Sequence, residues 1–205
     1  MAEFKLLNKH LVKAFLMVIE PLARVFINLK VHPHVVTFTG LIFSILAALS
    51  FVYGKFFSAG VLIILAGICD VLDGRLARET NTLSKFGALF DSTIDRYSEV
   101  LIFLGLSSYF LVRGSYLVLI IIFAIAGSFM VSYTRARAEG LGIECKVGIM
   151  QRQERITFLA AGAILGSIPG TSNLFLLLSI WTIAIFANIT VIQRIIYINR
   201  QLEKV

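Results

Sequence analysis

The stretch from Cys69 to Arg96 reads CDVLDGRLARETNTLSKFGALFDSTIDR, and it places carboxylates at the ends of two apolar runs. Its aspartates are Asp70, Asp73, Asp91 and Asp95. A charged side chain at membrane depth costs about 2.5 to 3.5 kcal/mol on insertion scales, so several in one place need a compensating role. Each pair is spaced by three or four residues and projects from one helix face, and the polar turn over 79–84 lets the two helices run antiparallel. The sequence therefore predicts that the four carboxylates converge at one end of two neighbouring helices.

Such a convergence of carboxylates indicates a divalent metal site. Without a cation, carboxylates at short range repel one another and take up protons. Oxygen ligands suit hard cations, and shared carboxylates can bridge two of them. No histidine or cysteine stands at ligand spacing nearby, which disfavours zinc. We therefore expect Mg²⁺ or Mn²⁺ as the cofactor.

The composition predicts an all-α integral membrane protein. Of the 205 residues, 58% are hydrophobic and only 15% are charged, and the mean hydropathy of +0.89 is too high for a soluble domain. Apolar runs long enough to cross a bilayer predict six transmembrane helices. These runs cover residues 35–53, 59–78, 86–112, 116–138, 156–168 and 172–198.

The first 34 residues differ from the rest, because basic residues alternate there with apolar residues at steps of three and four. This periodicity is typical of an amphipathic helix at the membrane interface. A cleaved signal peptide is disfavoured, since Glu20-Pro21 interrupts the apolar run and no small-residue cleavage site follows. We expect a juxtamembrane segment over 1–34, a membrane domain over 35–198 and a cytoplasmic tail over 199–205.

The net charge of +7 is distributed unevenly along the chain. With six spans, all of the 19 lysines and arginines except Lys55 and Arg113 fall on one side of the membrane. The positive-inside rule then places both termini and the aspartates in or at the cytoplasm. Basic residues so placed serve anionic lipid headgroups and phosphate ligands, which disfavours a nucleic-acid partner. The expected location is the plasma membrane.

The string Asp70-x2-Asp73-Gly74-x2-Ala77-Arg78-x8-Gly87-x3-Asp91-x3-Asp95 resembles the signature of the CDP-alcohol phosphotransferase family at all eight positions. The resemblance implies a six-helix membrane enzyme with an N-terminal juxtamembrane helix, which is also the layout inferred above. It further implies transfer of a phosphoalcohol group from a CDP-linked lipid to an acceptor hydroxyl, with release of CMP. A homodimer is expected from the same resemblance.

The roles of the family's motif residues carry over by position. The resemblance makes Asp70, Asp73 and Asp91 ligands of two metal ions and makes Asp95 the catalytic base, which can also touch a metal. A carboxylate is a suitable base for the acceptor proton. The expected contacts to the CDP group are Pro33, Thr37, Asp70, Asp73, Gly74, Ala77, Arg78 and Ser84. The segment around Pro33 and Thr37 resembles a Pro-Asn-x-x-Thr pattern with His34 in place of Asn, and it also reads as a proline turn and a helix N-cap.

A second segment narrows the acceptor. Residues 132–140, followed by Gly148-x3-Arg152-x-Glu154-Arg155, resemble phosphatidylinositol phosphate synthases and their archaeal inositol-phosphate counterparts. The resemblance implies inositol 1-phosphate, whose phosphate calls for fixed cations such as the planar arginine fork. The expected ligands are Arg135, Arg155 and Arg194, with Arg152 and Arg137 as second choices. Basic residues at these helix ends also follow from topology alone.

Two other functions stay open from the sequence. Glycerol 3-phosphate also carries a phosphate, so a phosphatidylglycerophosphate synthase is the alternative enzyme. An ion or proton transporter would use the intramembrane aspartates differently, but such proteins often show repeats and broken helices. This sequence has no evident repeat and only three prolines. Release of CMP from a CDP-lipid, with and without Mg²⁺, distinguishes these functions.

Overall fold

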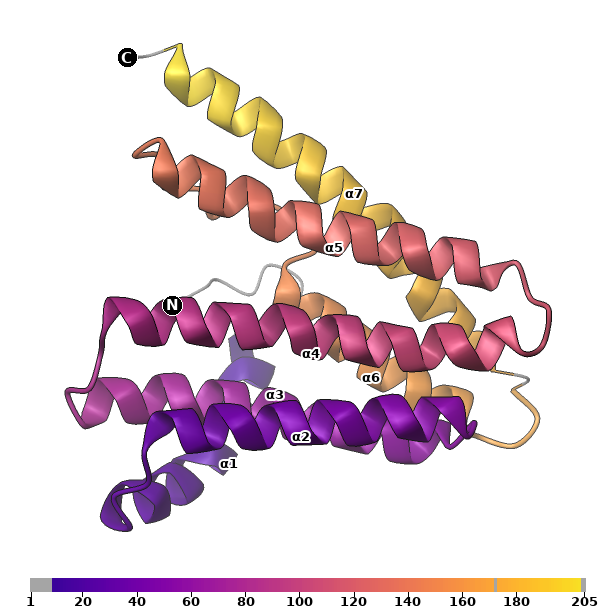
Figure 1. The fold of residues 1–205 in the computed structure, drawn as a ribbon, viewed down its shortest axis with the longest axis horizontal. Helices are drawn as coiled ribbons and strands as arrows, with labels where there is room; N and C mark the ends of the chain where they lie inside the picture. The colour runs from indigo at the N-terminus through magenta and orange to yellow at the C-terminus, as the bar shows by residue number, and fades with distance from the viewer. Residues whose placement is uncertain (1–8, 172, 204–205) are drawn as a thin grey trace.

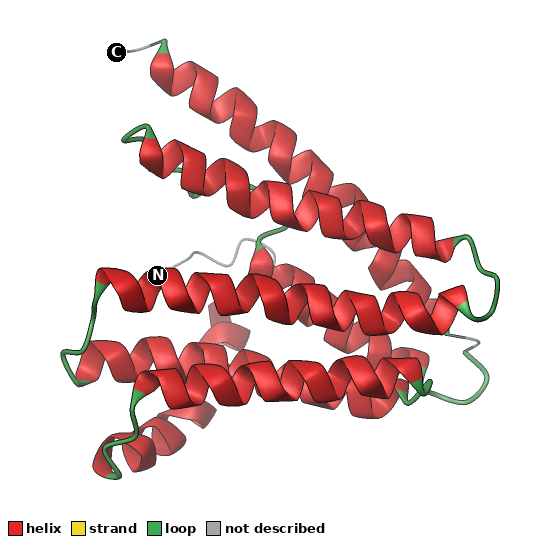
Figure 2. Cartoon of the chain, viewed as in Figure 1, coloured by secondary structure: helices red, strands yellow, loops and turns green. Residues whose placement is uncertain are grey.

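The structure is a computed structural model that describes residues 9–171 and 173–203. Within these ranges all regular structure is helical and no strand is present (Figure 2). The predicted all-α class is therefore confirmed. The helices are α1 (Lys9–Asn28), α2 (Pro33–Val52), α3 (Phe56–Glu79), α4 (Lys85–Leu111), α5 (Leu117–Gly140), α6 (Arg152–Gly166) and α7 (Leu174–Leu202).

The helices form two groups that are joined by α6 (Figure 1). In the first group α2 packs against α3 and α4, and in the second α5 packs against α7. The short helix α6 packs against α3 and α7 and so touches both groups. One apolar core, which includes Phe51, Ile63, Phe103 and Leu176, is shared by these helices. This arrangement makes α6 a central element that can present side chains to both groups.

One end of the bundle collects the turns between α1 and α2 and between α3 and α4, together with the C-terminal ends of α5 and α7 (left in Figure 1). These are the segments that the charge pattern assigns to one side of the membrane. The connections between α2 and α3, between α4 and α5, and between α6 and α7 lie at the opposite end, and the first two contain Lys55 and Arg113. The aspartates of α3 and α4 therefore belong to the basic end of the bundle.

Four of the six predicted spans are long and apolar enough to cross a membrane, namely α2, α3, α5 and α7. The other two predicted spans, α4 and α6, do not meet that description within the described residues. The first half of α4 carries Asp91, Asp95, Arg96 and Glu99, which lower its hydropathy. Helix α6 has only 15 residues, about 22 Å of helix, which is short for a bilayer core of about 30 Å. The chain is thus a membrane protein in which four described helices are long and apolar enough to span the bilayer.

Helix α1 lies outside the bundle against α3, and it covers part of the predicted juxtamembrane segment. It continues through Pro21, while residues 1–8 of that segment lie outside the described part of the chain. Ile19 and Ala23 are buried against the apolar side of α3. Glu20 also pairs with Arg75 of α3 at 2.5 Å, and hydrogen bonds from Arg75 and Arg24 lower the pKa of this carboxyl. The juxtamembrane helix is therefore held to the helix that carries two of the aspartates.

Helices α2 and α4 approach each other closely at Gly105. A Cβ atom added to Gly105 would lie 2.3 Å from the carbonyl oxygen of Ala48, which is a backbone atom and cannot turn away. The absence of a side chain at Gly105 is therefore what allows α4, with its two aspartates, to lie this close to α2.

Replacing Gly105 with alanine should lower the stability of the protein by about 1 to 3 kcal/mol, the usual effect of overpacking. The matched control is Gly140→Ala at the end of α5, where an added Cβ meets nothing within 4 Å. The measurement is unfolding of both variants in detergent. Equal stability of the Gly105 variant and the wild type would contradict the close approach of α2 and α4.

Candidate functional site

Three of the four predicted carboxylates meet at the basic end of the bundle. Asp70 lies in α3, and Asp91 and Asp95 lie one turn apart in α4. One oxygen from each of the three lies within 4.8 Å of the others. This distance lets one cation contact all three residues.

Asp73, the fourth predicted carboxylate, is held apart from this triad by a neighbour on α2. Its side chain is 4% exposed, and the hydroxyl of Thr37 donates to its Oδ2 at 2.7 Å. Thr37 is itself buried in the second turn of α2, so its alternative interpretation as a helix N-cap is wrong. The helix instead begins at Pro33, and His32 caps it by accepting a hydrogen bond from the backbone N–H of His34. The hydroxyl of Thr37 is thus used to orient Asp73.

The donor set fits a hard divalent cation. The triad supplies carboxylate oxygens only, and such ligands suit Mg²⁺ or Mn²⁺. In addition, Oδ1 of Asp91 is buried without a hydrogen-bond partner among the described residues. A buried polar atom without a partner is unfavourable, and a bound cation would satisfy it.

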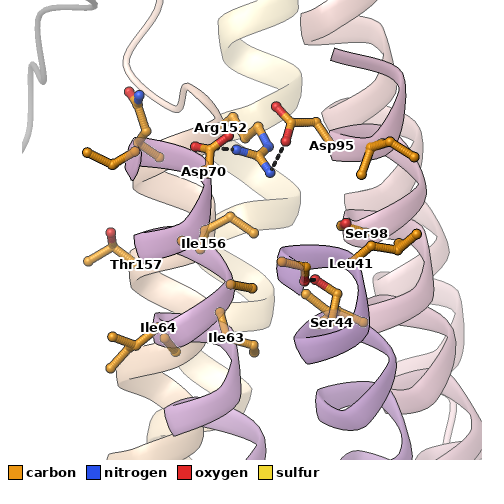
Figure 3. Close-up of a pocket in the computed structure, with 18 of the residues that line it drawn as sticks. Leu41, Ser44, Ile63, Ile64, Asp70, Asp95, Ser98, Arg152, Ile156 and Thr157 are labelled. Atoms are coloured by element: carbon orange, nitrogen blue, oxygen red, sulfur yellow. Dashed lines mark hydrogen bonds and ion pairs between the residues drawn. The ribbon is translucent and has the colours of Figure 1, made fainter. Parts of the chain in front are cut away.

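Arg152 at the start of α6 bridges two members of the triad (Figure 3). Its guanidinium lies 2.9 Å from Oδ2 of Asp70 and 2.6 Å from Oδ1 of Asp95. The prediction that Arg152 binds the acceptor phosphate does not match this geometry, because its fork is directed at the carboxylates. The spacing in sequence gives no indication of this contact, since it depends on how α6 packs beside α3 and α4.

A second buried ion pair lies one turn deeper on the same helices. Arg155 of α6 donates through Nε and Nη2 to the two carboxylate oxygens of Glu99 on α4, at 2.7 and 3.0 Å. Both side chains are at most 2% exposed, and Arg96 lies 3.6 Å from the same carboxylate. Glu99 was not among the residues predicted from the sequence. Its position four residues after Asp95, on the same face of α4, could have indicated that it belongs to this group of carboxylates.

The three arginines predicted for the acceptor phosphate differ in their surroundings. Arg155 is 1% exposed and donates to Glu99 and to the carbonyl of Met150, so binding of a phosphate would compete with these contacts. Arg194 is 2% exposed and donates to the carbonyls of Val147 and Val131. Arg135 is 46% exposed and pairs with Glu139 at 2.9 Å on its own helix.

Arg194 donates to the carbonyl of Val131, which lies one turn before Arg135 on α5, so the two arginines share one region. The second-choice residue Arg137 is exposed on the same helix as Arg135. An anion near the end of α5 would therefore meet more than one guanidinium.

The small residues of the motif leave the surface beside the triad open. A Cβ atom on Gly74 would meet only the mobile end of Arg78, at 3.6 Å. Ala77 is half-buried and Arg78 is exposed. Ser84 caps α4, since its Oγ accepts a hydrogen bond from the backbone N–H of Gly87 at 2.9 Å. This capping role is a sufficient reason for a serine at position 84, with no contact to a ligand required.

A cavity of about 640 Å³ begins at the triad and is lined by α2, α3, α4 and α6. At one end its lining is polar and charged, with Thr37, Asp70, Asp73, Asp95 and Arg152. Away from these residues the lining is mostly apolar, as Figure 3 shows for Ile63, Ile64 and Ile156. The polar side chains of Ser44, Ser98 and Thr157 also line this part. A cavity with one charged end and one apolar end is suited to an amphiphilic molecule.

The comparisons with known proteins identify the class. A family model for CDP-alcohol phosphatidyltransferases matches residues 30–195, so the chain belongs to this family of membrane-bound transferases. It is 36% identical to an archaetidylinositol phosphate synthase of Methanothermobacter thermautotrophicus, over 82% of this chain and 83% of the relative. It is also 35% identical to a phosphatidylinositol phosphate synthase of Streptomyces avermitilis, over 96% of this chain and 84% of the relative.

Solved structures with this fold come from Mycobacterium tuberculosis. Its phosphatidylinositol phosphate synthase with CDP-DAG bound superposes with a TM-score of 0.80 at 31% identity, covering 89% of this chain and 94% of the other. The same enzyme in complex with manganese and citrate gives a TM-score of 0.77 at 32% identity, covering 87% of each chain.

The buried pair between Glu99 and Arg155 should be far more important for stability than a surface pair. Glu99→Gln leaves the Arg155 charge buried without its partner, which should cost about 3 to 5 kcal/mol. The control is Glu139→Gln, which breaks the exposed pair with Arg135 and should cost at most about 1 kcal/mol. Denaturation in detergent measures both. If Glu99→Gln is no less stable than the control, the buried pair does not join α4 to α6.

Proposed function

We propose that this protein transfers a phosphatidyl-type group from a CDP-linked lipid to inositol phosphate and releases CMP. The observation that carries the proposal is the aspartate triad at the charged end of an otherwise apolar cavity. Its relatives support the choice of substrates, because the similar enzymes are named for inositol phosphate products and one was solved with CDP-DAG.

The metal-binding residues in this proposal are Asp70, Asp73, Asp91 and Asp95. The first, third and fourth supply the triad, and Asp73 is oriented beside it by Thr37. Bound Mg²⁺ or Mn²⁺, as two ions, would neutralise the diphosphate of the donor and stabilise the leaving CMP. A similar enzyme solved with manganese supports a divalent cation here.

In this proposal Asp95 is the general base. A hydroxyl of the acceptor attacks the β-phosphorus of the donor, and a new phosphorus–oxygen bond forms while the bond to the oxygen of CMP breaks. Asp95 takes the hydroxyl proton, because it lies in the triad and lines the cavity. The open surface at Gly74 and Ala77 and the exposed Arg78 would face the CDP group. Pro33 and Ser84 would influence this surface indirectly, because Pro33 begins α2 and Ser84 caps α4.

The donor lipid's apolar part would occupy the apolar length of the cavity. The lining by Ile63, Ile64 and Ile156 supports this placement, since burial of each methylene contributes about 0.8 kcal/mol. The lipid therefore binds with its diphosphate at the aspartates and its chain among α2, α3, α4 and α6.

The acceptor's phosphate would bind near Arg135 and Arg194, with Arg137 beside them. Both residues lie toward the C-terminal ends of α5 and α7, and Arg135 is exposed. Arg155 supports this region through its pair with Glu99 and does not contact the phosphate itself.

The membrane arrangement that goes with this reaction has both termini and the aspartates on the cytoplasmic side of the plasma membrane. In it α4 and α6 complete six membrane-embedded helices over 35–198, with a juxtamembrane segment over 1–34 and a tail over 199–205. The grouping of the basic segments at one end of the bundle supports it. We also propose a homodimer.

Activity should require a divalent cation and each residue of the triad. Asp91→Ala, like Asp70→Ala, should abolish CMP release from a CDP-lipid, because the remaining oxygens cannot hold the cation. Excess EDTA should do the same to the wild type, and Mn²⁺ should restore it. The control is Glu203→Gln, an exposed acidic residue at the end of α7. Full turnover in EDTA would contradict the metal site.

Substitutions in the acceptor site should weaken binding of the acceptor and leave binding of the CDP-lipid unchanged. Arg135→Ala and Arg194→Ala each remove a charge-assisted hydrogen bond of about 1.5 to 3 kcal/mol, so KM for inositol phosphate should rise about tenfold to a hundredfold. KM for the CDP-lipid should stay unchanged. Arg200→Ala, at an exposed position on α7, is the control.

The same assay tests the choice of acceptor. The wild type should prefer inositol 1-phosphate over glycerol 3-phosphate and free inositol. A preference for glycerol 3-phosphate would instead make the protein a phosphatidylglycerophosphate synthase.

A further inference from the structure

Arg152 occupies an unusual position for a cation, because it lies among the residues that the proposed function assigns to a metal. Its single guanidinium contacts Asp70 of α3 at 2.9 Å and Asp95 of α4 at 2.6 Å (Figure 3). Both carboxylates belong to the triad. One arginine from α6 thus links the two helices that carry the metal-binding residues.

We propose that Arg152 is the internal counter-cation of this site, which holds Asp70 and Asp95 together before metal binding and competes with the incoming metal. The proposal rests on the proposed function, since it takes the triad to be a metal site. It gives Arg152 a positioning role that sets metal affinity, in place of the phosphate-binding role predicted from sequence.

The position of Arg152 is fixed by the second ion pair. Arg155 lies three residues further along α6 and is held by both oxygens of Glu99 and by the carbonyl of Met150. Glu99 lies four residues after Asp95 on α4, so the pairs Asp95 with Arg152 and Glu99 with Arg155 form two successive links between the same helices. The deeper link is almost fully buried and anchors the start of α6. The guanidinium of Arg152 is therefore directed at the triad by the packing of α6.

The triad is only partly neutralised by Arg152. Arg152 contacts Asp70 and Asp95, and Arg96 lies 3.8 Å from Asp95, whereas Oδ1 of Asp91 is buried with no hydrogen-bond partner among the residues that the structure describes. We therefore expect an incoming cation to bind Asp91 first. Full coordination by all three residues then requires Arg152 to give up its contacts, because like charges a few ångströms apart in a partly buried site repel strongly.

Two substitutions at Arg152 separate competition from simple structural support. Glutamine removes the charge, so competition predicts tighter metal binding. Lysine keeps the charge but offers a point donor that cannot bridge two carboxylates as a planar fork does. The expected order of the dissociation constant for Mn²⁺ is therefore wild type above Arg152→Lys above Arg152→Gln. A purely structural arginine predicts the opposite, since loosening of the triad weakens binding.

The experiment measures Mn²⁺ binding to the full chain in detergent, by electron paramagnetic resonance of free Mn²⁺. Arg152→Gln should lower the Kd for Mn²⁺ at least tenfold, or about 1.4 kcal/mol, and Arg152→Lys should lower it about threefold. Arg113→Gln, in the connection between α4 and α5 at the opposite end of the bundle, should leave the Kd unchanged. In EDTA, Arg152→Gln should also have a lower Tm than the wild type, and saturating Mn²⁺ should remove that difference.

The outcomes distinguish this proposal from the function on which it rests. If the wild type binds no Mn²⁺, or if Asp91→Ala binds it as well as the wild type, the metal site itself is wrong. If the wild type binds Mn²⁺ through Asp91 but Arg152→Gln has an equal or higher Kd, the competition is wrong and the metal site stands. Should Arg152→Gln fail to fold, a Kd for Arg152→Lys equal to or above that of the wild type overturns the proposal by itself.

Discussion

Compensation of buried carboxylate charge is the constraint on which this structure depends. Asp70, Asp91, Asp95 and Glu99 lie among apolar helices, where an unpaired charge is expensive. The described part of the chain meets this cost with arginines placed at the start of α6, of which Arg155 pairs with Glu99 and Arg152 reaches the triad. The divalent cations of the proposed mechanism would complete the compensation that arginine begins.

The rest of the fold follows from placing these charges. α6 is too short to be explained as an ordinary span, yet it lies between α3 and α7, where its first turn meets the aspartates. Gly105 lets α4 approach α2, and Thr37 of α2 orients Asp73. The apolar remainder of α6 then lines the cavity, so one element supplies both the charged end and part of the lipid-like wall.

The convergence of the carboxylates of α3 and α4 could be predicted from the sequence, because spacings of three and four residues and a short polar turn are local properties. The packing of both helices against α2, more than against each other, could not. Apolar runs likewise predicted the helices, although only four of the described helices are long and apolar enough to be candidate spans. The partners of the arginines could not be predicted in this way. Arg155 and Arg152 were expected to bind a phosphate, but their contacts with Glu99 and Asp70 join residues far apart in the chain. Ion pairs between helices depend on how the helices pack, and the periodicity of the sequence does not predict that packing.

The most direct test of the central claim is the position of a bound metal. Crystals of the protein grown with Mn²⁺, with diffraction recorded at the manganese absorption edge, give that position from the anomalous signal alone. The account predicts an anomalous peak within coordination distance of Asp70, Asp91 and Asp95. Manganese ordered elsewhere in the protein, with no peak at these three aspartates, would contradict it.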